Sequence, residues 1–194
     1  MKLPTFLAKP RAKAAILNLC VASSLALPVH LVYAGGDQSE LPRRLADAKI
    51  SLTEGISRAG QLQGLPISAK FEMEGKDLHL SVYTAKQGRA VAAENNELIE
   101  LSGNASTPAW QPEKEIFSDK PHIARAAMQL TVIQQSKLGL LELLKKSAAQ
   151  HQGTIYSITP DVQNGKPAFK LLILGAQGKT SESWIDLDGN RLAQ

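Results

Sequence analysis

Cysteine is nearly absent from this sequence of 194 residues, in which Cys20 is the only one. One cysteine cannot form an intramolecular disulfide, so the fold must depend on its hydrophobic core. Beyond residue 34 the histidines are His79, His122 and His151, and no two of them lie four residues apart. Because zinc sites need closely spaced Cys and His ligands, we expect no metal and no cofactor. We interpret the three histidines as surface or loop residues.

Recognisable catalytic motifs are also missing. There is no Gly-x-Ser-x-Gly nucleophile elbow and no glycine-rich loop of the kind that cradles phosphate. Asp186, Asp188 and Asn190 have the alternation of the first ligands in a calcium-binding loop. However, Gly189 follows Asp188 by one position instead of three, and no glutamate follows to complete the ligand set. We therefore predict a turn at this point and a protein that is not an enzyme.

The first 34 residues have the order of a secretory signal peptide. Basic residues precede an apolar run from Ala14 to Leu27, Pro28 interrupts it, and Val32-Tyr33-Ala34 precedes Gly35-Gly36. The alternative is a membrane anchor, but the run is shorter than the roughly 20 apolar residues that a spanning helix requires. We discount a lipid-modified Cys20 because Leu19 before it is too large. The sequence predicts cleavage after Ala34 and a periplasmic or secreted protein with no membrane contact after cleavage.

Removal of this segment changes the charge balance. Residues 1–34 contain four basic residues and no acidic one, out of 22 and 18 in the whole chain, so 18 of each sign remain. A surplus of lysine and arginine is what nucleic acid or an anionic membrane would require. We therefore expect neither as a partner.

The last third of the chain predicts one helix followed by an antiparallel hairpin and a closing strand. Leucines at helical spacing run from Leu140, and Gly153 follows the predicted helix as a candidate C-cap. Asn164-Gly165 is a strong signal for a tight hairpin, because both central residues of that turn need positive φ. Ser181–Leu187 is the third predicted strand.

A second copy of this order lies upstream. Ser51 and Glu54 fit a helix capping box, and a strand is predicted from Ile67 to Glu74. Gly75-Lys76 lies 90 residues before Gly165-Lys166, which predicts an internal repeat. At that offset the apolar positions of the second strand disagree by one residue between the copies. We expect a bulge or a register shift to account for the difference.

These patterns resemble the PepSY domain, an extracytoplasmic module in which one helix packs on an antiparallel sheet. The residues that carry the resemblance are Ile50–Ile56 in the first copy and, in the second copy, Leu140–Leu144, Asn164–Leu171 and Trp184–Leu192. The resemblance implies an α+β fold of two tandem units, each with a helix on a small antiparallel sheet, plus a linking helix. We expect a signal peptide at 1–34, unit 1 at 35–101, a linker loop and helix at 102–136, and unit 2 at 137–194.

The linker contains three prolines and is predicted to be a loop from Ser102 to Pro121. Its apolar residues Trp110, Ile116 and Phe117 are predicted to attach it to the core, because buried aromatic residues usually serve packing. The alternative is that Trp110 and Phe117 form an exposed partner-binding patch. The periodic segment that follows is either a separate helix or one long bent helix over residues 122–150.

The resemblance also implies a function. PepSY domains occur in propeptides of secreted metallopeptidases, so we expect a non-catalytic module that binds another polypeptide and restrains or regulates a peptidase. No peptidase follows in this sequence, so the target would be a separate chain, and the edges of the two small sheets could accept a strand from it. The alternative is a ligand-sensing or envelope-assembly domain without a peptidase target. The sequence does not define the oligomeric state.

Overall fold

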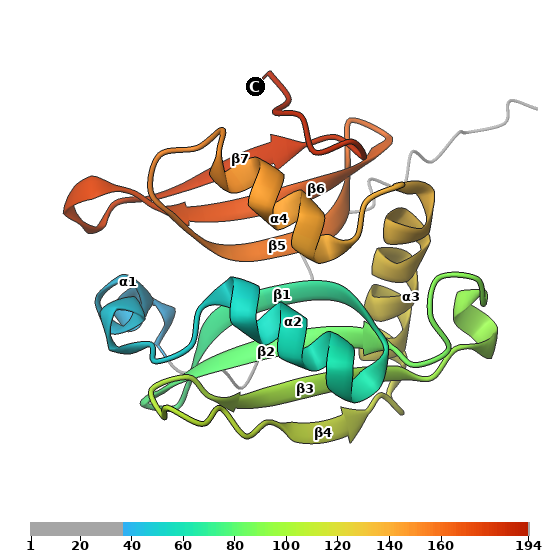
Figure 1. Cartoon of the computed structure of the whole chain (residues 1–194), viewed down its shortest axis with the longest axis horizontal. Helices are drawn as coiled ribbons and strands as arrows, with labels where there is room; N and C mark the ends of the chain where they lie inside the picture. The colour runs from blue at the N-terminus through green and yellow to red at the C-terminus, as the bar shows by residue number, and fades with distance from the viewer. Residues whose placement is uncertain (1–36, 194) are drawn as a thin grey trace, which may run out of the picture. The chain divides into compact units, whose positions relative to one another are not determined.

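The computed structural model describes residues 37–193, which form an α+β fold (Figure 1). The predicted signal peptide lies outside these residues. None of the helices within 37–193 is long and apolar enough to cross a membrane. The α-helices are α1 (Leu41–Arg44), α2 (Leu52–Gln63), α3 (Lys120–Gln135) and α4 (Leu140–Ala148). The strands are β1 (Leu65–Glu74), β2 (Asp77–Ala85), β3 (Leu98–Asn104), β4 (Glu113–Ile116), β5 (Thr154–Gln163), β6 (Lys166–Leu174) and β7 (Thr180–Ile185).

All seven strands belong to one antiparallel sheet in the order β4-β3-β2-β1-β5-β6-β7. The sequence predicted two small sheets, one in each unit. They are joined where β1 pairs with β5, with Ala69 opposite Ile158 and Lys70 opposite Ser157. This junction uses one edge of each predicted sheet, so β4 and β7 are the outer strands of the combined sheet.

The two hairpins superimpose in sequence with an offset of 89 residues, which is the spacing of Gln63-Gly64 and Gln152-Gly153 and one less than that of Gly75 and Gly165, while the buried positions of α2 and α4 are 88 apart. Met73 pairs with Leu78 in the first hairpin, and Val162 pairs with Pro167 at the same place in the second. With this offset the apolar positions of β2 and β6 agree, so no register slip separates the copies. A bulge is present in both units, so it is not the difference between the copies that we expected. It falls between Pro66 and Ser68 in β1 and between Ile155 and Ser157 in β5.

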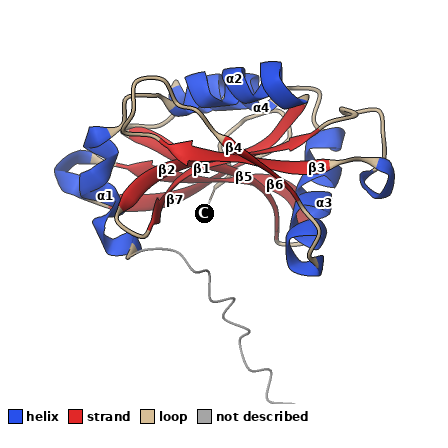
Figure 2. Cartoon of the chain, turned by 90° about the horizontal axis from the view of Figure 1, so that it is seen from below, coloured by secondary structure: helices blue, strands red, loops and turns tan. Residues whose placement is uncertain are grey.

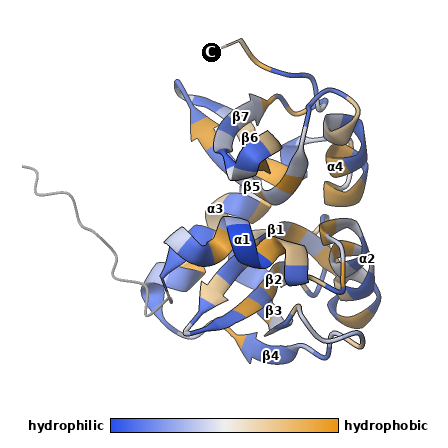
Figure 3. Cartoon of the chain, turned by 90° about the vertical axis from the view of Figure 1, so that its left-hand side faces the viewer, coloured by the Kyte–Doolittle hydropathy of each residue, from blue (hydrophilic) through white to orange (hydrophobic). Residues whose placement is uncertain are grey.

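Helices α2 and α4 pack on one face of the sheet, which we call the helix-covered face (Figure 2). Each buries four positions at the spacing i, i+3, i+4 and i+7, which is the periodicity of one helix face. In α2 these are Leu52, Gly55, Ile56 and Ala59, and in α4 they are Leu140, Leu143, Leu144 and Ser147. Hydrophobic residues are present along α2, α4 and the strands (Figure 3), and the strand residues Leu80 and Phe169 are fully buried.

The ends of these helices follow the predicted local chemistry in part. The Ser51 side chain accepts a hydrogen bond from the Glu54 backbone N–H, at 3.1 Å, and Gly64 ends α2 with φ 92°. Helix α4 ends at Ala148, so Gly153 is not its C-cap. Gly153 has φ 105° and precedes β5 directly. Asn164 and Gly165 have φ 51° and 76°, which confirms the predicted hairpin turn.

The segment between the two units differs from the prediction. Residues Ser102–Pro121 do not form a continuous loop, because β3 runs to Asn104 and β4 pairs alongside it. The third strand of unit 1, β3, begins at Leu98, after the short 3-10 helix Ala93–Asn95. Residues 122–150 form two helices, because Ser136 leaves the helical region with ψ 143°. Asp119 caps the first of these helices by accepting from the His122 N–H.

Candidate functional site

The opposite face of the sheet, which we call the open face, has helices only at its ends. Helix α1 lies at one end and α3 at the other, while α2 and α4 lie across the sheet (Figure 2). One row of directly paired residues on the open face crosses all seven strands. The row consists of Glu113, Ser102, Ser81, Lys70, Ser157, Leu172 and Glu182. Lys70 is at the centre of the row, and Ser81 and Ser157 on either side of it are buried.

Polar contacts connect the centre of this row. The Ser81 hydroxyl lies 2.8 Å from the Glu72 carboxylate and 3.0 Å from the Ser102 hydroxyl. Lys70 forms an ion pair with the second oxygen of Glu72, and both side chains are partly exposed, at 31% and 22%. Because Ser81 itself is only 1% exposed, the serines form the floor of the open face and the charged residues form its walls.

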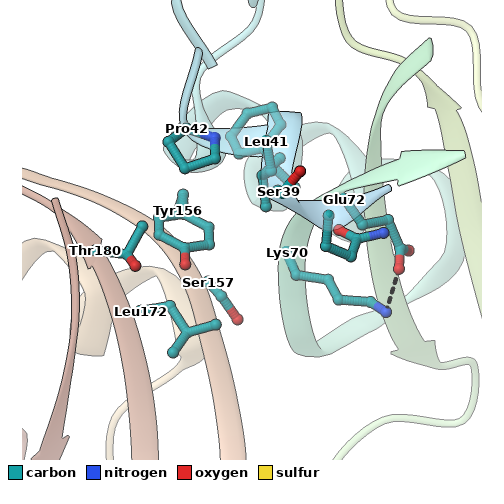
Figure 4. A pocket seen from close by; sticks show the side chains of 11 residues that line it. Ser39, Leu41, Pro42, Lys70, Glu72, Tyr156, Ser157, Leu172 and Thr180 are labelled. Carbon is teal, nitrogen blue, oxygen red and sulfur yellow. Dashed lines mark hydrogen bonds and ion pairs between the residues drawn. The ribbon is translucent and has the colours of Figure 1, made fainter. Parts of the chain in front are cut away.

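A groove opens where the 3-10 helix Gln38–Glu40 and α1 approach the sheet (Figure 4). Its volume is about 490 Å³, which is within the usual range for small-molecule pockets. Leu41, Pro42, Tyr156 and Leu172 give it apolar walls, and the Lys70–Glu72 pair lies at its side. Burial raises the pKa of Tyr156, so its phenol is a neutral hydrogen-bonding group at physiological pH.

Glu100 is the most perturbed carboxyl group near the open face. Burial raises its pKa, and the negative charges of Glu72 and Glu115 act in the same direction, while a hydrogen bond from Ser81 and the charge of Lys70 oppose them. Glu115 lies directly opposite Glu100 in the β3–β4 register. Burial and the charges of Glu100 and Glu72 raise the pKa of Tyr83 as well. Burial is the main cause of both shifts, and the neighbouring carboxylates over β2, β3 and β4 add to it.

His79 contacts both a serine and a carboxylate, which raises the question of a catalytic triad. Its Nδ1 atom lies 3.3 Å from the Ser102 hydroxyl and 2.6 Å from the Glu74 carboxylate. In a catalytic triad the serine and the acid bind different ring nitrogens, so that one proton can be passed while the other holds the ring. Both contacts of His79 are made by one nitrogen. The arrangement therefore lacks the geometry of a relay.

His151 has a better geometry than His79 for a base beside a serine nucleophile, but it lies on the helix-covered face. Its Nδ1 lies 2.8 Å from the Ser147 carbonyl and its Nε2 lies 2.8 Å from the Ser183 hydroxyl. A carbonyl can only accept, so Nδ1 donates, and in the neutral imidazole Nε2 then accepts from Ser183. Ser183 is only 3% exposed, so this pair connects the end of α4 to β7 beneath the surface. His151 lies in the loop between α4 and β5, as expected, and is half-buried there.

The Asp186–Asn190 segment is a turn, as predicted. One oxygen of the Asp186 carboxylate accepts from the backbone N–H groups of Asp188 and Asn190, at 2.9 and 2.8 Å. Within residues 37–193, no group of three or more His, Cys, Asp or Glu side chains is arranged to hold a metal ion. The carboxylate is thus engaged by the backbone of its own turn.

Trp110 and Phe117 are buried, with 3% and 7% of their surface exposed. The indole N–H of Trp110 donates to the Gly103 carbonyl, and the Phe117 ring packs edge-on against Tyr83 with 4.8 Å between centroids. They attach the linker to the core, as the packing hypothesis predicted, so we correct their assignment as an exposed partner-binding patch. Ile116, the third apolar residue of this segment, is 50% exposed on β4.

The two sheet edges are less suited to strand addition than the sequence suggested. β4 has only four residues, all exposed, and three of them are charged. Short charged edges are a common protection against pairing with other chains. On β7, the C-terminal segment returns to the outer side, where the Leu192 N–H donates to the Trp184 carbonyl. The open face, which the sequence did not identify, is therefore the better candidate. The only sequence signal for the open face was the alternation of serine and charged residues along β1, β2 and β3.

Comparisons with known proteins give little further guidance. No protein-family model matches this chain, and no curated protein sequence matches it significantly. Among solved structures, the chain is similar to a candidate lipoprotein from Clostridium difficile 630, with 12% sequence identity and a TM-score of 0.40. The match covers 75% of this chain and 92% of that protein.

Proposed function

We propose that this protein is an exported, non-catalytic module of the PepSY-like type that binds another polypeptide on its open face. The observation that carries the proposal is the row of seven paired residues from Glu113 to Glu182, which crosses the sheet between α1 and α3. A sheet face with a floor of serines can accept an extended chain. Such binding needs no reactive residue on this protein.

Export is part of the proposal and rests on the sequence of residues 1–34. The intact mass of the protein recovered from the secreting cell tests it. We expect a mass that corresponds to a chain beginning at Gly35. A mass that retains Met1 to Ala34 would contradict export with cleavage.

Photo-crosslinking from defined positions tests the binding surface. A photoreactive residue replaces Glu113, which is exposed on the open face, or Thr180, which is exposed at its groove. In the comparison pair it replaces Thr53 or Lys145, which are exposed on α2 and α4. We expect polypeptide adducts in the cell envelope from the first pair and none from the second. Adducts from the helix positions alone would refute the open face as the binding surface.

A peptidase is the narrower class of partner, and it follows from the PepSY resemblance alone. Peptidases assayed with and without the protein should show slower cleavage in its presence, and the protein alone should cleave nothing. A second candidate function is small-ligand sensing, which the groove of about 490 Å³ favours. A small molecule that co-purifies with the protein, in the absence of any crosslinked polypeptide, would replace the binding proposal with this one.

A further inference from the structure

The open face of unit 1 has an imbalance of charge that bears on the chemistry of the partner. Along β1 to β4, its positions carry the carboxylates of Glu72, Glu74, Glu100, Glu113 and Glu115. Within these four strands Lys70 is the one lysine on that face, and it forms an ion pair with Glu72. Residues 35–194 are neutral in sum, so the acidic excess is local to this surface.

Two of these negative charges, those of Glu100 and Glu115, lie where they repel each other. Glu100 and Glu115 are directly opposite on neighbouring strands, and like charges at such positions destabilise a sheet. Burial and the charge of Glu72 make the ionised form of Glu100 less favourable still. A cation placed over β3 and β4 would remove this repulsion, whereas an anionic partner such as nucleic acid would increase it.

The acidic surface is continuous with the apolar groove. Lys70 and Glu72 belong to the groove lining as well as to the polar centre of the open face, and Figure 4 shows them beside Ser157 and Leu172. A bound chain that reaches the acidic surface therefore also reaches an apolar pocket. Neighbouring strands are about 4.8 Å apart, so β3 and β5 are separated by roughly 14 Å. An extended chain covers that distance in about four residues at roughly 3.3 Å each.

We propose that the polypeptide bound by the open face is an extended cationic segment, with a lysine or arginine over Glu100 and Glu115 and an apolar side chain in the groove about four residues away. This inference rests on the proposed function and specifies the chemistry of its partner. Charge complementarity selects the cation, and the walls formed by Leu41, Pro42 and Tyr156 select the apolar anchor.

Synthetic peptides test the inference. The first probe is a dodecapeptide with lysine at its first and seventh positions, leucine at its fifth and eleventh, and serine elsewhere. Two matched peptides replace each lysine by glutamine or by glutamate. Binding to the mature protein is measured by fluorescence anisotropy in low and high salt. We expect the lysine peptide to bind about tenfold more tightly than the glutamine peptide, and this advantage to shrink in high salt because exposed charges are screened.

Variants locate the interaction. Glu100→Gln combined with Glu115→Gln should weaken binding of the lysine peptide by about three- to tenfold without affecting the glutamine peptide. Glu54→Gln is the control, because it removes a carboxylate from α2 on the helix-covered face. It should change the binding of neither peptide. Circular dichroism confirms that each variant is folded.

The outcomes separate the two proposals. Equal binding of the lysine and glutamine peptides, or equal losses in Glu54→Gln and the double variant, would overturn the cationic inference while leaving open-face crosslinking intact. Binding of the glutamate peptide alone would overturn it as well. Absence of both peptide binding and open-face crosslinks would instead overturn the proposed function.

Discussion

Ile67 of β1 and Tyr156 of β5 occupy the extra position of a β-bulge in their respective strands, and they lie 89 residues apart. A bulge bends its strand and increases the local twist. Both units therefore bend at the same place, just after the glycine that begins each hairpin. Both side chains are also buried, at 0% and 7% exposure. The shared bulge supports the internal repeat more strongly than the turn residues do, because it fixes the register of both strands that meet at the centre of the sheet.

The Asn164-Gly165 turn gives the first prediction. Gly165 has φ 76° and a Cβ there would meet nothing within 4 Å, so any cost of a side chain comes from the backbone alone. Gly165→Val should lower stability by about 1–2 kcal/mol, because a β-branched residue resists positive φ. Urea denaturation measures the change. Gly175→Val is the matched control, since Gly175 has an ordinary φ of −86°. Equal effects of the two substitutions would contradict the assigned turn.

The close approach of α2 to the sheet gives the second prediction. A Cβ on Gly55 would overlap the Leu80 side chain, so Gly55→Ala should destabilise the protein by about 1–3 kcal/mol through overpacking. In a Leu80→Ala background the space exists, and alanine is the better helix former by about 1 kcal/mol. We therefore expect the sign of the Gly55→Ala effect to reverse there. A double-mutant cycle by urea denaturation measures the coupling, and additive effects would exclude the contact.

Local signals predicted the elements that depend on short-range chemistry. The Ser51 cap, the Asn164-Gly165 turn and the periodicity of α2 and α4 each arise from a few neighbouring residues. β4 was missed because Glu113–Ile116 is exposed at all four positions and so has no alternation of apolar and polar residues. Its assignment depends on pairing with β3, which no local pattern encodes.

The candidate site could not be predicted from the sequence, for a related reason. The pairing of Lys70 with Ser157 joins strands that are far apart in the chain, and only this junction converts two small sheets into one broad face. Trp110 and Phe117 were candidates because they are aromatic residues in a polar segment, but their large apolar rings are also the reason that they are buried. The polar residues of the open face look like ordinary solvent-facing positions until the sheet order is known.

Arg89 gives the third prediction, which concerns the junction of α3 and α4. Its guanidinium donates to the carbonyl oxygens of Ile133, Ser136 and Leu138, where α3 ends. Because carbonyl groups at a helix C-terminus lack partners within the helix, Arg89→Ala should cost about 2–3 kcal/mol. Arg89→Lys should recover less than half of this, because an ammonium group cannot reach several carbonyls as a planar guanidinium can.

Chemical denaturation with urea measures both Arg89 variants. Arg58→Ala is the control, because its ion pair with Glu54 is exposed and should contribute less than about 1 kcal/mol. If Arg89→Ala costs no more than Arg58→Ala, the three contacts do not hold the junction.

The last prediction concerns the pH dependence of stability at Glu100. Burial raises the pKa of this carboxyl in the folded protein above its value in the unfolded chain. Between the two values the folded state binds more protons, so stability falls as pH rises through this window, and the full cost is present above the folded pKa. Glu100→Gln removes this cost and the repulsion from Glu115, while its amide oxygen can still accept from Ser81. Like charges directly opposite each other destabilise a sheet by up to about 1 kcal/mol. The melting temperature of Glu100→Gln at neutral pH should therefore rise by about 2–4 °C.

Melting curves of Glu100→Gln recorded across the acidic range provide the check, because the stabilisation should disappear below the ordinary pKa of a glutamate, where the wild-type carboxyl is protonated in both states. Glu113→Gln, exposed on β4 and opposite Ser102, should have little effect at any pH. A gain that is the same at all pH values would exclude titration of Glu100 as its origin. The same Glu100→Gln substitution is expected to weaken the binding of a cationic segment. Stability and binding would then change in opposite directions, as occurs where a fold retains an unfavourable charge for its partner.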